Sequence, residues 1–167
     1  MRGSILRVIF GMPGGETPPV LERVRDELTS CGIDAVLSNN IRRDCLMKFS
    51  YVSPQGACGL YYGVSAGAMQ KPGEVRDCFA ALVEEIGLLA GAEGVELGPG
   101  LKDRNLRILD GVEPSMTTSL QRDILRGGPS EIHGLLYRVP EQGKALGVRL
   151  PTYEKIAAAL QQRTDEN

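Results

Sequence analysis

The spacing of apolar residues changes once along this chain, after residue 38, and that change limits the folds open to it. Before it, two short runs rich in β-formers, residues 5–10 and 33–37, flank a helical stripe. Beyond it, apolar residues recur with the 3.6-residue period of a helix, and no further strand is predicted. A strand–helix–strand segment this small needs a larger sheet to join. We therefore expect a βαβ segment in residues 1–38, followed by a helical domain in residues 39–167.

Helix start and stop signals divide the chain further. Thr17 is the expected N-cap of the first helix, and Thr117 or Thr118 is the expected N-cap of a later one. A helix capped by Asn39 or Asn40 runs toward Pro54, which is expected to kink or end it. Other helices are predicted to begin near residues 71, 99, 129 and 151.

Charge and hydropathy exclude several classes of partner. The chain has 19 basic and 21 acidic residues, so its formal net charge of −2 offers no positive surface for nucleic acid or an anionic membrane. No stretch approaches the roughly 18 apolar residues of a membrane span, and no signal peptide is recognisable. We expect a soluble cytoplasmic protein that binds neither nucleic acid nor membrane.

Metal ligation is also not expected. The four cysteines form no C-x-x-C pair, and the chain has a single histidine, His133. Reduced, buried thiols are the expected state of all four. His133 lies two residues after Glu131 and could serve as a base, but we interpret it as a partly exposed helix position.

Searches for familiar catalytic motifs find none that is complete. The chain has no G-x-G-x-x-G between a strand and a helix, no phosphate-binding G-x-x-x-x-G-K, no H-E-x-x-H and no G-x-S-x-G. The glycines of the segment GAEGVELGPG lie between predicted helices, where capping explains them. The residues taken alone therefore define no active site.

Four short segments in order nevertheless form a recognisable pattern. They are NNIRRDCLMKF (39–49), PSMTTSLQRDI (114–124), PSEIHG (129–134) and LGVRLP (146–151). Ser119 precedes Asp123 by four residues, and Asp123 precedes Glu131 by eight. In sequence and spacing these segments resemble the C-terminal domain of the ketopantoate reductase (2-dehydropantoate 2-reductase) family.

The resemblance implies a fold and an activity. The family's C-terminal domain is a mainly α helical bundle of the 6-phosphogluconate dehydrogenase C-terminal-like type, which binds the substrate and usually forms a homodimer. Residues 1–38 would then be the last strand–helix–strand of a truncated dinucleotide-binding domain. The complete enzyme would use NADPH to reduce ketopantoate to pantoate, in pantothenate biosynthesis. This chain alone would bind no cofactor and be inactive, and its cofactor-binding residues stay unassigned.

The resemblance also suggests roles for individual residues. Lys48 matches the catalytic lysine, which polarises the ketone and donates a proton, and Glu131 matches the glutamate that accepts hydrogen bonds from lysine or substrate. Ser119 matches the serine that binds the substrate carboxylate, whereas Asp123 is interpreted as structural. Each residue also has a structural alternative. Lys48 could be a solvated lysine on a helix, and Glu131 could be a favourable charge in the first turn of a helix. Ser119 could compete with Thr118 for the N-cap position.

Departures from the family pattern put the substrate in doubt. Family members carry asparagines at the places of Val52, Gly56 and Ala66, none of which can hydrogen-bond through its side chain. Gln55 lies seven residues after Lys48 and could supply a substitute amide if the helix continues past Pro54.

Two alternatives to ketopantoate reduction stay open. An apolar lining by Val52, Tyr51 and Tyr61 would favour another, less polar 2-oxo acid. A site that has lost three amides could instead belong to a non-catalytic binding or oligomerisation module. We also expect Pro140 to break the helix between residues 134 and 147.

Overall fold

The computed structural model describes residues 7–165, and these fall into two compact units. The first ends at Met47 and the second begins at Lys48. Residues 5 and 6 of the first predicted strand lie outside the described residues.

The first unit is built around the predicted βαβ segment. Strands β1 (Arg7–Phe10) and β2 (Asp34–Leu37) pair in parallel, with Arg7 opposite Asp34, and α1 (Pro19–Ser30) connects them. The prediction of Thr17 as the N-cap is wrong, because Pro18 occupies that position with an extended backbone. A residue that precedes proline is driven to extended conformations, so the helix begins only at Pro19.

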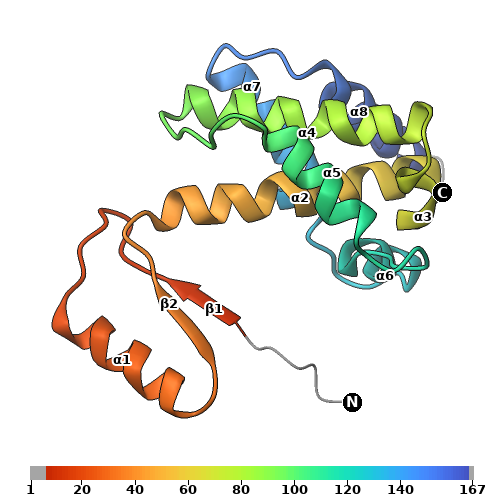
Figure 1. Cartoon of the computed structure of the whole chain (residues 1–167). Helices are drawn as coiled ribbons and strands as arrows, with labels where there is room; N and C mark the ends of the chain where they lie inside the picture. The colour runs from red at the N-terminus through yellow and green to blue at the C-terminus, as the bar shows by residue number, and fades with distance from the viewer. Residues whose placement is uncertain (1–6, 166–167) are drawn as a thin grey trace. The chain divides into compact units, whose positions relative to one another are not determined.

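The second unit is a helical bundle, as the resemblance implied, and contains no strand between residues 48 and 165 (Figure 1). Its first helix continues from the first unit. The elements in order are α2 (Ile41–Tyr62), α3 (Ala66–Gln70), α4 (Glu74–Ala92), α5 (Leu101–Asp110), α6 (Ser119–Leu125), the π-helical turn η1 (His133–Tyr137), α7 (Arg138–Ala145) and α8 (Pro151–Asp165).

The sequence predicted that Pro54 would kink or end α2, and it does not end the helix. The helix continues eight residues beyond it, to Tyr62. Proline in a helix interior costs roughly 3 kcal/mol, through a missing N–H and a steric conflict. Here every residue from Ser53 to Gly59 is buried, and the packing of that segment offsets the local cost.

Pro140 likewise produces no break. It is the third residue of α7, and η1 leads into α7 without interruption. The amide of Arg138 bonds to the carbonyl of His133, five residues earlier, as in a π-helix. Because Pro140 has no N–H to offer Leu136, the chain changes its hydrogen-bond spacing here and remains helical.

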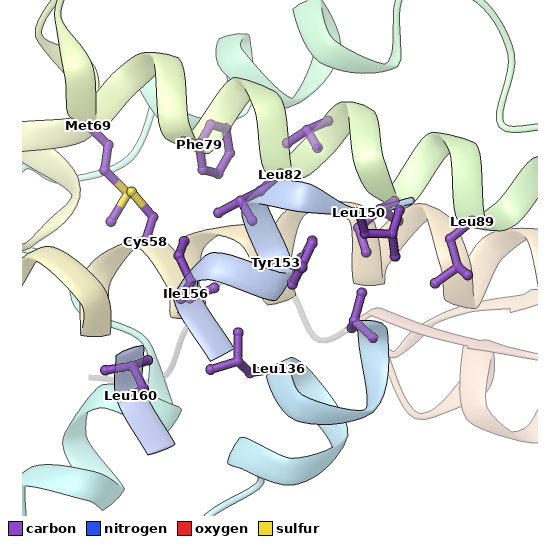
Figure 2. Close-up of a cluster of buried hydrophobic side chains, with 14 of the residues drawn as sticks. Cys58, Met69, Phe79, Leu82, Leu89, Leu136, Leu150, Tyr153, Ile156 and Leu160 are labelled. Carbon is purple, nitrogen blue, oxygen red and sulfur yellow. The ribbon is translucent and has the colours of Figure 1, made fainter. Parts of the chain in front are cut away.

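The core of the second unit lies between α4, α8 and η1. Figure 2 shows Phe79 and Leu82 of α4 facing Tyr153 and Ile156 of α8, and all four side chains are at most 1% exposed. Leu136 of η1 closes the cluster and is fully buried. These positions recur every three or four residues on their helices, as the sequence pattern predicted.

A buried carboxylate fixes the start of α8. Glu85 of α4 is 6% exposed and accepts the backbone N–H groups of Thr152 (2.7 Å) and Tyr153 (3.0 Å). The first amides of a helix have no partner within it and carry partial positive charge, so a carboxylate is well suited to them. Glu85 thus joins α4 to the first turn of α8.

None of the helices within residues 7–165 is long and apolar enough to cross a membrane.

Candidate active site

Lys48 projects from a face of α2 that it shares with two other residues of interest. Gln55 and Gly59 lie seven and eleven residues after Lys48, which on a regular helix places each within about 20° of it. Lys48 itself is exposed, whereas Gln55 and Gly59 are buried. Because α2 continues through Pro54, the condition for placing Gln55 on the lysine's face is met.

The first turn of α6 packs onto this same face. A Cβ atom added to Gly59 would lie 2.6 Å from the side-chain amide of Gln121, and one added to Gly56 would lie 3.1 Å from Leu120. Glycine at these positions therefore lets α6 approach α2 closely. Ser119 is the first residue of α6 and is exposed.

A capping box holds that turn. Thr118 is the N-cap, as predicted, and its side chain accepts the N–H of Gln121 at 3.1 Å. The Gln121 side-chain oxygen accepts the N–H of Thr118, and its Nε2 donates to the carbonyl of Val64 at 2.8 Å. Since Thr118 provides the cap, Ser119 does not compete for that role, and its hydroxyl stays on the surface.

Glu131 lies at the start of a third segment that contacts α2. Its carbonyl accepts the N–H of Leu135 (2.9 Å), and the carbonyl of Leu135 accepts the hydroxyl of Ser53 on α2 (2.6 Å). Lys48 lies on α2 itself, and the segments that carry Ser119 and Glu131 are anchored on the same helix. Along the helix axis, their anchor points at Gly59 and Ser53 lie roughly 16 and 7 Å from Lys48. All three side chains are exposed, and within residues 7–165 no hydrogen bond or ion pair joins them.

On the face of α2 that carries Lys48, the side chain of Gln55 is buried with a hydrogen-bond donor unpaired among the described residues. It is 5% exposed, and its Nε2 has no hydrogen-bond partner within the described chain. A buried amide donor left unpaired costs roughly 1–3 kcal/mol, so a polar ligand group that reached it would gain that much. The buried hydroxyl of Tyr51 is also without a described partner, and desolvation raises its pKa.

Two of the three positions where family members carry asparagine, Gly56 and Ala66, are buried and tightly packed. The space beside Gly56 is filled by Leu120, and Ala66 is fully buried, with its N–H bonded to the carbonyl of Met116. Val52 is half-buried. In place of the amides, the chain therefore has two buried, packed residues and one half-buried apolar side chain.

Sequence reasoning missed a buried hydrogen-bond chain behind this face. The hydroxyls of Ser53 and Tyr153 lie 2.6 Å apart, and Ser53 also contacts the carbonyl of Leu135. Because a carbonyl can only accept, Ser53 donates to Leu135 and Tyr153 donates to Ser53. Burial raises the pKa of the Tyr153 hydroxyl, which keeps it a donor. This series of hydrogen bonds joins α2, η1 and α8, one helical turn after Glu131.

Replacing Ser53 by alanine is expected to destabilise the protein by about 2 kcal/mol, since two buried partners lose their bonds. Tyr153→Phe should cost about 1 kcal/mol, because the Ser53–Leu135 bond survives. Urea denaturation of each variant measures both losses. Tyr62→Phe is the control, because its hydroxyl bonds to an exposed carboxylate, that of Glu74. Equal effects of Ser53→Ala and Tyr62→Phe would contradict this account.

The structure also shows where His133 and Asp123 lie and whether the described residues could bind a metal. His133 is exposed at the start of η1 and packs edge-on against Tyr137, in agreement with its interpretation as an exposed helix position. Within residues 7–165, no group of three or more His, Cys, Asp or Glu residues could hold a metal ion. Asp123 is half-buried on α6.

Comparison with protein families gives one match that covers most of the chain. The model of the family described as "Ketopantoate reductase PanE/ApbA C terminal" matches residues 40–164. Among curated proteins, the uncharacterized oxidoreductase YkpB of Bacillus subtilis is 24% identical over 158 residues, covering 93% of this chain and 51% of YkpB. The chain thus spans about half the length of this relative.

Solved structures share the fold at low sequence identity. The 2-dehydropantoate 2-reductase of Methylococcus capsulatus aligns with a TM-score of 0.87 and 20% identity, over 98% of this chain and 52% of that one. A D-mandelate dehydrogenase bound to NADH and anilino(oxo)acetate aligns with a TM-score of 0.83 and 19% identity, over 96% and 67%. A dimeric ketopantoate reductase from Staphylococcus aureus aligns with a TM-score of 0.79 and 20% identity, over 90% and 53%.

Proposed function

This chain belongs to the ketopantoate reductase family through its C-terminal domain, and from that premise we propose that it binds the 2-oxo acid in an NADPH-dependent reductase. The observation that carries the proposal is the shared face of α2. Lys48 and the unpaired amide of Gln55 lie on that face, and the turn that bears Ser119 packs against it. Residues 39–167 form the substrate domain in this proposal, and residues 1–38 end the nucleotide-binding domain.

Each side chain has a role that follows from its chemistry. The ammonium of Lys48 hydrogen-bonds the 2-oxo oxygen, polarises the carbonyl and gives up a proton as the hydride adds to carbon. The hydroxyl of Ser119 donates to the substrate carboxylate. Glu131 accepts a hydrogen bond from Lys48 or from a substrate hydroxyl, and Gln55 offers its buried amide to the acid.

NADPH would supply the hydride when bound, but the described loop after β1 does not fit its phosphates. The loop after β1 has three glycines, yet the Glu16 carboxylate lies against Gly14, and the backbone carbonyls of Ser38 and Asn39 lie against Gly11 and Gly15. A phosphate needs N–H donors or cations, whereas these groups are acceptors. We therefore propose that residues outside this chain hold the cofactor and that this chain alone is inactive.

The absence of hydrogen-bonding side chains at Val52, Gly56 and Ala66 favours a substrate less polar than ketopantoate. Ketopantoate carries a hydroxyl, and a site that hydrogen-bonds such a group can discriminate by orders of magnitude against analogues without it. The related D-mandelate dehydrogenase was crystallised with an oxoacetate that carries an anilino group. We rank a 2-oxo acid with an apolar or aromatic side chain above ketopantoate.

The test is a substrate panel with the whole protein. Initial rates of NADPH oxidation are measured with ketopantoate, 2-oxoisovalerate, 2-oxo-4-methylvalerate and phenylglyoxylate, and repeated with NADH. We expect kcat/KM for at least one apolar acid to exceed that for ketopantoate by about tenfold or more. A preference for ketopantoate would overturn the substrate ranking, and no turnover of any 2-oxo acid would overturn the reductase proposal in favour of a binding module.

We also propose a homodimer in the cytoplasm. The dimeric Staphylococcus aureus relative supports the assembly, and so does Leu125 at the end of α6, which is 83% exposed. The free thiols of all four cysteines are consistent with a reducing compartment. Light scattering coupled to size exclusion measures the mass, and a purely monomeric whole protein would contradict the dimer.

A further inference from the structure

Two cysteines, Cys58 of α2 and Cys78 of α4, lie at or behind a cavity whose lining includes none of Lys48, Ser119 and Glu131. The cavity measures about 410 Å³ and opens between the end of α2, the first turns of α4 and the first turns of α8. Cys78 lines it together with Tyr62, Glu74 and Lys155. Reagents in solution can therefore reach the sulfur of Cys78, which is half-buried.

Cys58 lies in the protein interior, behind the α4 residues that line the cavity. It is fully buried beside Met69 in the core cluster (Figure 2). Its Sγ lies 3.4 Å from the carbonyl oxygen of Val75, one helical turn before Cys78 on α4. The thiols of Cys58 and Cys78 also lie close enough for each to shift the pKa of the other. The S–H of Cys58 donates to the Val75 carbonyl, and it can turn to the neighbouring sulfur when Cys78 is charged. The expectation that all four cysteines are buried is wrong, because Cys31 and Cys45 are exposed.

The surroundings of Cys78 favour its thiolate. The neighbouring Cys58 thiol, the hydroxyl of Tyr62, which can turn to Cys78 from Glu74, and the ammonium of Lys155 each stabilise the charged sulfur, so the pKa of Cys78 is lowered. Partial burial and the carboxylate of Glu74 act in the opposite direction but do not cancel the effect. The pKa of Cys58 is raised by the neighbouring Cys78 and by its burial, so Cys58 stays a protonated thiol.

We propose that Cys78 is an oxidation site for hydroperoxides and that Cys58 is its resolving partner. The Cys78 thiolate attacks the peroxide, the O–O bond breaks, and a sulfenic acid and an alkoxide or hydroxide form. The sulfur of Cys58 then attacks that sulfenic sulfur and loses its proton, and water leaves as the disulfide forms. The peroxide is reduced by two electrons and the two thiols are oxidised by two. An accessible thiolate beside a buried thiol is typical of redox-sensing cysteines.

The test uses the whole chain with Cys31→Ser and Cys45→Ser, which removes the two exposed thiols. A stoichiometric hydroperoxide is added, and peptides are then mapped without reduction. We expect a Cys58–Cys78 disulfide, with the protein lighter by two hydrogen atoms. With Cys58→Ser added, oxidation should stop at a sulfenic acid on Cys78 that a dione reagent traps. A Cys78 that stays reduced, or that is oxidised without engaging Cys58, would overturn the proposal.

Alkylation kinetics check the charge on Cys78 separately. At pH 7 Cys78 should react with iodoacetamide about threefold or more faster in the folded chain than in urea, despite its lower exposure, because its pKa is lowered. As pH falls, this advantage should persist below the range in which an ordinary thiol stops reacting. Lys155→Met should reduce the advantage. A slower reaction in the folded chain than in urea would contradict the role of the cavity.

Discussion

Replacing Lys48 by alanine is expected to lower kcat of the whole protein toward its best 2-oxo acid by roughly 10²- to 10⁴-fold. The ammonium is the proposed donor to the ketone oxygen, and without it the alkoxide that forms as hydride adds has neither a charge partner nor a proton source. KM should change far less, because the substrate carboxylate is assigned to Ser119. Steady-state kinetics with NADPH measure both constants.

Two further variants show whether the loss is specific to Lys48. Lys71→Ala removes an exposed lysine at the end of α3 and should leave kcat unchanged. Lys48→Arg keeps the positive charge but holds its proton too tightly to donate it, so it should recover binding more than turnover. If Lys48→Ala retains full turnover, Lys48 is a solvated helix residue and the assignment of the site is wrong.

Replacing Glu85 by alanine is expected to cost about 3–5 kcal/mol of the free energy of unfolding, the largest stability effect we anticipate. Hydrogen bonds to charged groups are worth about 1.5–3 kcal/mol each, and the alanine leaves the N–H groups of Thr152 and Tyr153 without their acceptor. At roughly 2–4 °C per kcal/mol, the Tm should fall by about 10 °C. Calorimetry or thermal circular dichroism measures the shift.

The neighbouring residue provides a matched control. Glu84 is exposed and forms a surface ion pair with Lys102 (2.6 Å), so Glu84→Ala should have a much smaller effect. Glu85→Gln keeps one acceptor oxygen without the charge, and its loss should lie between the two. Similar effects of Glu84→Ala and Glu85→Ala would show that Glu85 does not hold α8 in place.

Residues close in the sequence predicted where helices and strands occur better than they predicted whether a helix continues through a proline. The change of period after residue 38, the helix cap at Thr117 or Thr118 and the proline at position 151 each depend on residues close in the sequence. Each is confirmed, with Thr118 as the cap. The expected end of the helix at Pro54 does not occur, because burial of the surrounding residues offsets the free-energy cost of a proline in a helix. Thr17 misled because the conformational effect of Pro19 on Pro18 outweighed a favourable capping side chain.

The contacts that build the site could not be read from the sequence. Ser53 and Tyr153 are 100 residues apart, and Glu85 and Thr152 are 67 apart, so no periodicity connects them. The two glycines under α6 could be noted as small residues, but their partners, Leu120 and Gln121, could not. Lys48, Ser119 and Glu131 were named from a family resemblance, and their convergence on one substrate stays a prediction.

One measurement tests that convergence directly: the crystal structure of the whole protein with the oxidised cofactor and a non-reducible 2-oxo acid analogue such as an oxamate. Our proposal predicts the 2-oxo oxygen at a hydrogen-bonding distance of about 3 Å from Nζ of Lys48, with the carboxylate on the hydroxyl of Ser119 and Glu131 beside the lysine. An analogue bound away from α2, or a Lys48 side chain directed into solvent beside an occupied site, would contradict it.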